Sequence, residues 1–304
     1  MTTPASDQVR RDARLLLMIF GGISAGLILA FSIVGAGGFD PGSMGAGQDA
    51  RSYWLAVRTS FPYELEWGAY GAYVYSPAFS QILSPVLVLP WQQFLALWTF
   101  MLMAALLVLT GPILFVVALP LGFFELWGGN IHLLLALAIV VGFRWPAAWS
   151  FVLLTKVTPG MGLLWFAVRR EWRSLGVALG ATAVIAAASW LVAPDLWREW
   201  LDILVRNAGI SPRPGSIAVS IWLRLPIAVL VVAYGARTNR RWLVPIGAML
   251  AMPALWGGSL SMLFAVIALE RPRIEKWLLS TIERLDPFHR SAGGRPSLLT
   301  EPEG

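Results

Sequence analysis

A single carboxylate beside a hydroxyl-bearing aromatic residue is the first feature of the chain that points to chemistry. Asp49 and Tyr53 are four residues apart, and residues at this spacing share one face of a helix. The carboxylate would suit a general base that takes the proton of an attacking hydroxyl group, with nearby aromatic side chains walling a sugar or a lipid chain. In the simpler alternative, Asp49 caps a helix and the aromatic residues anchor it at a membrane interface.

Lys156 is the second candidate, because a cation in its surroundings is costly. The chain has only two lysines, Lys156 and Lys276, and Lys156 lies within the apolar stretch 146–168. Holding a cation at bilayer depth costs about 2.5–3.5 kcal/mol on insertion scales unless it faces a cavity or a partner. An anionic ligand such as a phosphate would be a natural partner. The alternative is a structural pair with a buried carboxylate such as Glu125.

The stretch Gly128-Gly129-Asn130-Ile131-His132 places polar side chains between two short apolar segments. The glycines allow another segment to approach closely, and the asparagine and histidine offer polar contacts. The only other histidine is His289 near the end of the chain, so we expect His132 to be a packing residue with satisfied hydrogen bonds rather than a metal ligand. Glu125 is either the partner of His132 or a charge at the interface.

The composition defines the elements that must position these residues. Hydrophobic residues make up 57% of the 304 residues and charged residues 13%, against about 45–50% and 25% in soluble domains. We therefore predict an all-α, polytopic transmembrane helical bundle with about eight to ten membrane segments. The 16 Trp residues are typical of the aromatic belts of bilayer proteins.

The net charge of +6 comes from clusters at the ends of apolar segments, which indicates orientation in the bilayer and not binding of nucleic acid. With no cysteine, thiol catalysis and cysteine metal sites are excluded.

A bilayer core is crossed by about 20 apolar residues. The segments that match this length fully or in part are 15–35, 77–89, 91–110, 112–126, 129–143, 146–168, 173–192, 216–235, 243–256 and 257–269. Several are short or contain proline, which makes half-helices or kinked pairs possible.

The same pattern predicts the organisation of the chain. We expect a cytoplasmic stretch at 1–14 and one transmembrane domain at 15–270, followed at 271–304 by a cytoplasmic interfacial helix and a disordered tail. Arginine clusters beside the spans place both termini in the cytoplasm and put two long loops, near 35–76 and 194–215, on the extracytoplasmic face. Within the second loop, Leu and Trp at helical spacing predict an amphipathic interfacial helix over 194–204.

The order of these landmarks resembles the family-87 membrane glycosyltransferases. The matching motifs are Asp49 with Tyr53, Pro62-Tyr63, Tyr75-Ser76-Pro77, Leu89-Pro90 with Trp98, Gly129-Asn130, and Lys156-Val157-Thr158-Pro159. The resemblance covers about residues 15 to 265. This family has the multi-spanning C-type glycosyltransferase (GT-C) fold and includes bacterial α-1,2-mannosyltransferases.

The resemblance implies a reaction and a set of site residues. Such enzymes move a sugar, here mannose or another hexose or pentose, from a polyprenyl-phosphate donor to a lipid or glycan acceptor on the extracytoplasmic face of the cell membrane. Asp49 would be the catalytic base of an inverting transfer. We expect the substrate- and donor-binding residues to be Lys156, Tyr53, Arg51, Tyr75, Asn130, His132 and Trp256. No cofactor is required, although a divalent metal ion near Asp49 is compatible with the sequence.

Two other functions stay open at this point. The family often has a histidine shortly after a Pro and a Trp, which the segment Pro253–Gly258 lacks, so a catalytically inactive scaffold with the same fold is one alternative. The intramembrane Lys156 and the interrupted helices also fit a transporter or flippase for a lipid-linked substrate. Transporters are often built from paired internal repeats, and none is evident in this sequence.

Overall fold

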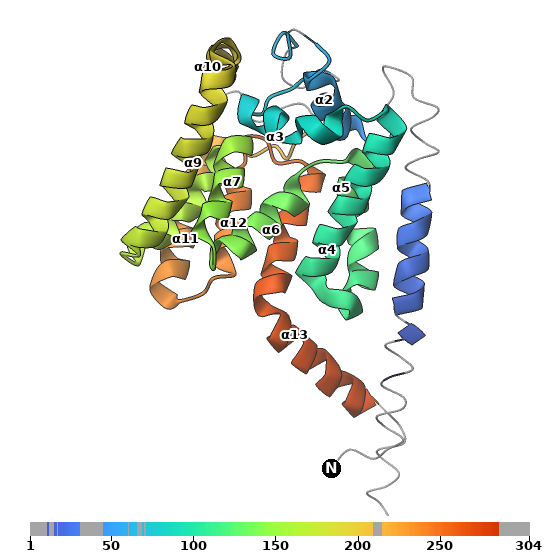
Figure 1. Cartoon of the computed structure of the whole chain (residues 1–304). Coiled ribbons are helices and arrows are strands. Elements are labelled where there is room, and N and C mark those ends of the chain that lie inside the picture. Colours follow the sequence, from blue (N-terminus) through green and yellow to red (C-terminus); the bar gives the residue numbers. More distant parts are fainter. Residues whose placement is uncertain are drawn as a thin grey trace, which may run out of the picture. The chain divides into compact units, whose positions relative to one another are not determined.

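The fold is helical throughout its regular segments (Figure 1). The computed structural model describes residues 11, 15–16, 18–30, 45–59, 61–65, 69, 71–208 and 215–285. Within these ranges the all-α prediction is confirmed. Some predictions lie outside the described residues. They concern the stretch 1–14 apart from Arg11, loop residues 31–44, 60, 66–68, 70 and 209–214, and the tail from 286, which includes His289.

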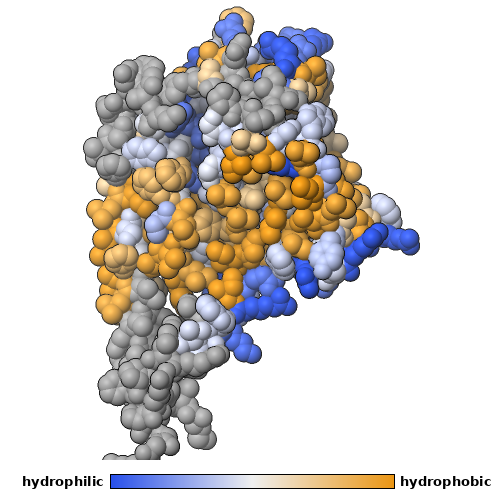
Figure 2. All heavy atoms as spheres, turned by 180° about the vertical axis from the view of Figure 1, so that it is seen from behind, coloured by the Kyte–Doolittle hydropathy of each residue, from blue (hydrophilic) through white to orange (hydrophobic). Residues whose placement is uncertain are grey.

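Three helices of the described chain are long and apolar enough to cross a bilayer. They are α4 (Trp91–Leu121), α9 (Trp172–Val192) and α11 (Ile221–Thr238). Shorter apolar helices accompany them at Met18–Ala30, His132–Gly142 (α6), Pro146–Thr155 and Thr158–Val168. Most residues of α9 are exposed, and most of these exposed residues are apolar. Hydrophobic residues gather in a broad band on the face shown in Figure 2. The chain is therefore an all-α membrane protein.

Most of the remaining elements are short, and the last of them is a helix of 22 residues. In chain order they are α2 (Gln48–Ala56), α3 (Pro77–Leu87), α5 (Phe123–Gly128), η1 (Pro146–Ala148), α7 (Trp149–Thr155), η2 (Thr158–Leu163), α8 (Leu164–Val168), α10 (Pro194–Asn207), α12 (Leu243–Leu250), η3 (Gly257–Leu263) and α13 (Phe264–Leu285). The chain forms two compact units, residues 1–269 and 270–304. Helix α13 starts in the first unit and ends in the second.

Helix α4 consists of two pieces that fold against each other. Gly111 has φ 74° and ψ 166°, a conformation open almost only to glycine, and Pro112 follows it. A Cβ atom at Gly122 would lie 3.5 Å from the Leu106 side chain, which is possible only if the second piece runs back along the first. The break expected between the predicted segments 91–110 and 112–126 is thereby confirmed, although the helix after it ends at Leu121 and α5 follows.

The predicted continuous span 146–168 is wrong, because the helix is interrupted at Lys156. Helix α7 ends at Thr155, and Lys156 is extended, with φ −137° and ψ 105°. The cause is Pro159, whose nitrogen has no hydrogen for the carbonyl of Thr155 and whose ring would clash with that carbonyl in a continued helix. Lys156 therefore lies in a gap between two helical pieces.

The predicted span 243–256 is also interrupted, and a buried arginine holds the irregular part. Helix α12 ends at Leu250, and the next helical turn starts only at Gly257. The guanidinium of Arg224 donates to the carbonyls of Leu250 at 2.8 Å, Met252 at 2.7 Å and Pro253 at 3.2 Å. These bonds satisfy backbone groups that the lost helix leaves free. The sequence pattern did not single out this arginine.

Helix α10 confirms the predicted amphipathic helix and extends it to Asn207. Its buried side presents Trp197, Trp200 and Ile203, and it packs against α3 and α9. The indole of Trp197 donates to Ser189 Oγ of α9 at 3.0 Å, and that of Trp200 donates to the Val74 carbonyl at 3.2 Å. These two hydrogen bonds attach α10 to α9 and to the segment before α3.

Candidate active site

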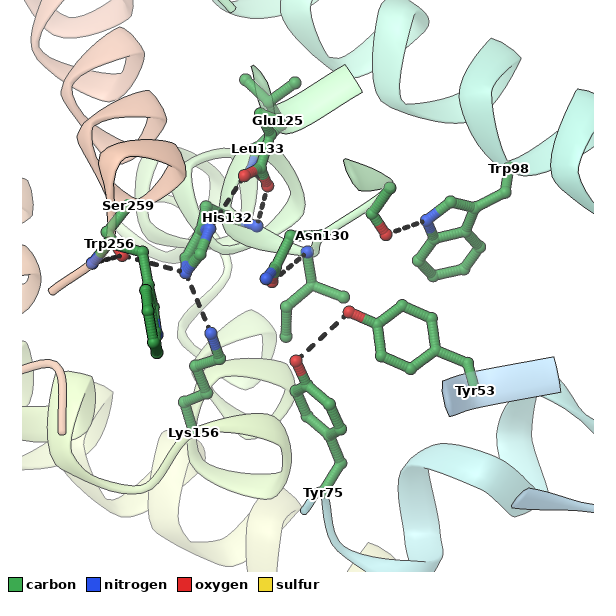
Figure 3. Close-up of polar contacts among 12 residues, drawn as sticks. Tyr53, Tyr75, Trp98, Glu125, Asn130, His132, Leu133, Lys156, Trp256 and Ser259 are labelled. Atoms are coloured by element: carbon green, nitrogen blue, oxygen red, sulfur yellow. Dashed lines mark hydrogen bonds and ion pairs between the residues drawn. The ribbon is translucent and has the colours of Figure 1, made fainter. Parts of the chain in front are cut away.

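One cavity of about 630 Å³ collects most of the residues that the sequence marked. Its walls come from α2, the turn between α5 and α6, the gap after α7, helix α10, the start of α11 and the irregular segment before η3. Six of the eight predicted site residues line it, namely Asp49, Tyr75, Asn130, His132, Lys156 and Trp256. They are separated by up to about two hundred residues in the chain, so the fold is what brings them together. Figure 3 shows five of them, all except Asp49.

Glycines on two segments set the position of Asp49. Gly47, with φ 77°, is the N-cap of α2 and its N–H donates to the Trp127 carbonyl at 2.7 Å. On the facing turn, a Cβ at Gly129 would lie 2.7 Å from the Ala50 Cβ, and one at Gly128 would lie 3.2 Å from Asp49 Oδ2. The first turn of α2 therefore packs directly on the Gly-Gly turn. Because Gly47 is the N-cap, the alternative in which Asp49 caps the helix is wrong.

The surroundings of Asp49 favour a stronger base than an exposed carboxylate. Burial in the cavity wall raises its pKa above the ordinary value, because a charged carboxylate loses hydration there. A hydrogen bond from the Asn130 side chain opposes part of this rise in pKa, and the nearby Glu125 carboxylate adds to it. Asp49 is half-buried and faces the cavity. Its carboxylate can therefore reach a bound hydroxyl group.

The other two predicted site residues, Tyr53 and Arg51, do not line the cavity. Tyr53 is fully buried, and its hydroxyl lies 3.2 Å from that of Tyr75. Its ring packs edge-on against the rings of Tyr75 and Phe79. Burial raises the Tyr53 pKa well above the ordinary value, so the phenol stays protonated. The guanidinium of Arg51 lies over the indoles of Trp54 and Trp91, at 4.7 and 4.9 Å from the ring centroids.

A connected set of three ionisable side chains lines the same cavity. Glu125 Oε2 lies 2.9 Å from His132 Nδ1, and His132 Nε2 lies 2.9 Å from Lys156 Nζ. Glu125 and His132 are each about 1% exposed, whereas Lys156 is half-buried and lines the cavity. Of the sequence alternatives, Glu125 is the partner of His132, and His132 has both ring nitrogens in contact, as expected for a packing histidine. Lys156 contacts the carboxylate only through the imidazole.

Several residues of the site were missed by sequence reasoning. Ser259 Oγ lies 3.4 Å from His132 Nε2 and accepts the Trp256 N–H at 3.1 Å, but a serine in a Gly-Ser stretch carries no distinctive signal. Trp98 Nε1 donates to the Gly129 carbonyl at 2.8 Å and fixes the Gly-Gly turn. Trp200 lines the cavity from α10, where the amphipathic pattern gave the only hint. Across the part of the chain that the structure describes, no three His, Cys, Asp or Glu side chains gather as metal ligands.

Comparison with known proteins decides the family. The model of glycosyltransferase family 87 matches residues 73–280, more than two thirds of the chain. The chain belongs to glycosyltransferase family 87. No curated protein and no solved structure gave a significant match. The family-87 region includes Tyr75, Asn130, His132, Lys156 and Trp256, and it begins after Asp49. The protein is thus a membrane glycosyltransferase, which acts on a sugar donor and an acceptor.

Proposed function

We propose that this family-87 glycosyltransferase moves a sugar from a polyprenyl-phosphate donor to a lipid or glycan acceptor, with Asp49 as the general base. Mannose is the first candidate sugar, and other hexoses or pentoses are possible donors. The observation that carries the proposal is the shared cavity, in which the Asp49 carboxylate and the Lys156 ammonium group reach one space from different walls. A reaction that removes a proton at one end and releases a phosphate at the other needs both groups.

The step itself is a single displacement. The acceptor oxygen forms a bond to the anomeric carbon while the bond from that carbon to the phosphate oxygen breaks. The acceptor proton goes to Asp49, and the electron pair of the broken bond stays on the phosphate, whose negative charge grows. Lys156 would stabilise this growing charge. One attack on one face inverts the anomeric centre, and no covalent enzyme intermediate is required.

The apolar part of the cavity suits the lipid chain of such a donor. Ile221, Trp222 and Leu225 from the first turns of α11 line the cavity, and α11 is one of the candidate membrane spans. Trp222 is 65% exposed, and Phe124 on the α5 wall is 75% exposed. A polyprenyl chain could therefore pass from the bilayer into the cavity over apolar side chains.

The decisive experiment is transfer of a radiolabelled sugar from its polyprenyl phosphate in proteoliposomes. We expect Asp49→Asn to lower the turnover about 100- to 10,000-fold, the usual contribution of a general base. The matched control is Asp195→Asn, an exposed carboxylate on α10 that pairs only with Arg198 among the contacts described, and it should keep wild-type turnover. Wild-type turnover in a folded Asp49→Asn protein would remove Asp49 from the mechanism. Movement of intact lipid-linked sugar across the bilayer without transfer would instead support a flippase.

A further inference from the structure

The protonation pattern of the Glu125–His132–Lys156 set follows from the contacts of the carboxylate. Glu125 Oε1 accepts the backbone N–H of His132 at 2.5 Å and, more weakly, that of Leu133 at 3.4 Å. These N–H groups start the 11-residue helix α6, whose N-terminus favours a negative charge. An ionised carboxylate has only acceptor atoms. The contact at 2.9 Å from Oε2 to His132 Nδ1 therefore places the imidazole hydrogen on Nδ1.

This tautomer determines what Lys156 can do. With the hydrogen on Nδ1, His132 Nε2 carries a lone pair and accepts from the Lys156 ammonium group at 2.9 Å. An ammonium group has three N–H donors, so two are left for other partners. The lysine lines the cavity, and its ammonium nitrogen lies 5.9 Å from the centroid of the Tyr75 ring (Figure 3). The imidazole thus holds the cation at a defined place while most of its hydrogen-bonding capacity is kept for a ligand.

We propose, resting on the function proposed above, that Glu125 is a positioning residue that acts through His132 to fix the Lys156 ammonium group for the donor phosphate. A free lysine side chain loses rotamer entropy when it is immobilised. When the protein already immobilises the lysine, this entropy loss no longer weakens ligand binding. It is also in place when negative charge grows on the leaving phosphate, which is where a fixed cation accelerates a reaction.

The backbone near Trp256 is shaped to admit the buried carboxylate. A Cβ at Gly258 would lie 3.0 Å from Glu125 Oε2 and 3.9 Å from His132 Nδ1, whereas a Cβ at the neighbouring Gly257 would meet nothing within 4 Å. Gly258→Ala should therefore push the carboxylate away from the imidazole without changing any of the three side chains. Gly257→Ala is the matched control, because the added methyl group enters open space.

The test is a double-mutant cycle on ligand binding with purified, full-length protein. The probes are polyprenyl monophosphate and the uncharged polyprenol of the same length, and the variants are Glu125→Gln, Lys156→Met and both together. In Glu125→Gln, the amide NH₂ can donate to Nδ1, so that the imidazole hydrogen moves to Nε2. The Nε2–H and the Lys156 ammonium group are then two donors that face each other, and their hydrogen bond is lost. We expect each single variant to bind the phosphate about 10- to 100-fold more weakly, the usual effect of a hydrogen bond to a charged group, with unchanged affinity for polyprenol.

The cycle separates positioning from a merely structural role. If Glu125 acts through Lys156, the double variant loses no more phosphate affinity than either single variant. Additive losses, or wild-type phosphate affinity in Glu125→Gln, would overturn the positioning role and leave the proposed function standing. A wild-type protein that binds phosphate and polyprenol equally would instead refute the proposed donor site as a whole. If Glu125→Gln does not fold, equal phosphate affinity of Gly258→Ala and Gly257→Ala overturns the positioning role, and a selective loss in Gly258→Ala supports it.

Discussion

At the scale of single residues, the burial of Asp49 should lower the stability of the folded protein, although the same carboxylate is the proposed general base. Its raised pKa means that the folded protein binds this proton more readily than the unfolded chain does. The contribution of Asp49 to folding stability therefore falls as the pH rises from the ordinary value of 3.8 through the raised pKa, and it stays unfavourable above that. We predict that Asp49→Asn raises the melting temperature at pH 7.5 relative to the wild type and that this gain shrinks towards pH 4. Thermal unfolding in detergent measures it, with the exposed Asp195→Asn as the control that should show no such gain. A lower melting temperature of Asp49→Asn at pH 7.5 would contradict the prediction.

Asn130 should tune the pH dependence of the same base. If Asp49 is the general base, as we propose, transfer needs its ionised form, and kcat/KM should rise with pH through the pKa of this carboxylate. The Asn130 hydrogen bond lowers that pKa, so Asn130→Ala should move the acidic limb of the pH profile to higher pH. The measurement is kcat/KM for sugar transfer between pH 4 and 8 in the two proteins. An acidic limb that moves to lower pH, or that does not move, would show that Asn130 does not act on the base.

At the scale of elements, the packing of α2 on the Gly-Gly turn decides whether Asp49 reaches the cavity. Gly129 has φ 70°, and its added Cβ would lie 2.7 Å from the Cβ of Ala50. We predict that Gly129→Ala costs about 1–3 kcal/mol for the left-handed conformation and also displaces α2, so that transfer falls more than the folded fraction does. Gly176→Ala in α9 is the control, because nothing lies within 4 Å of its added Cβ and the change favours the helix by about 0.5–1 kcal/mol. Denaturation in detergent and turnover per folded molecule, measured together, test it. Full turnover per folded molecule of Gly129→Ala would show that α2 needs no such close contact.

Local patterns predicted the elements better than they predicted the site. The spacing of Asp49 and Tyr53 gave helix α2, and the Leu and Trp spacing gave α10, because each signal lies within a few turns of chain. The interruption at Lys156 also has a local cause, Pro159, but the continuous apolar pattern around it indicated one span. The chain from Glu125 through His132 to Lys156 depends on contacts between residues 7 and 24 positions apart in sequence. Composition and spacing single out these three residues but do not predict which of them are in contact. They also do not predict that Tyr53 is buried behind Tyr75.

At the scale of the whole molecule, we predict the orientation in the bilayer from one helix and the basic cluster at its start. Helix α9 has 21 residues and a length of about 32 Å, enough to cross the hydrocarbon core. Arg169, Arg170 and Arg173 lie at its start, and α10 follows directly after its end. Because positive clusters stay in the cytoplasm, α10 and the cavity that it covers should face the extracytoplasmic side.

This orientation can be tested without background, since the natural chain has no cysteine. We predict that a membrane-impermeant maleimide labels Asp195→Cys, exposed at the start of α10, on intact cells. Thr238→Cys, exposed at the end of α11 beside Arg237 and Arg240, should react only after the membrane is opened. Each variant must keep transfer activity, which confirms that the labelled protein is folded. Labelling of Thr238→Cys on intact cells together with protection of Asp195→Cys would show the opposite topology. The Asp49 cavity and its donor would then lie on the cytoplasmic face.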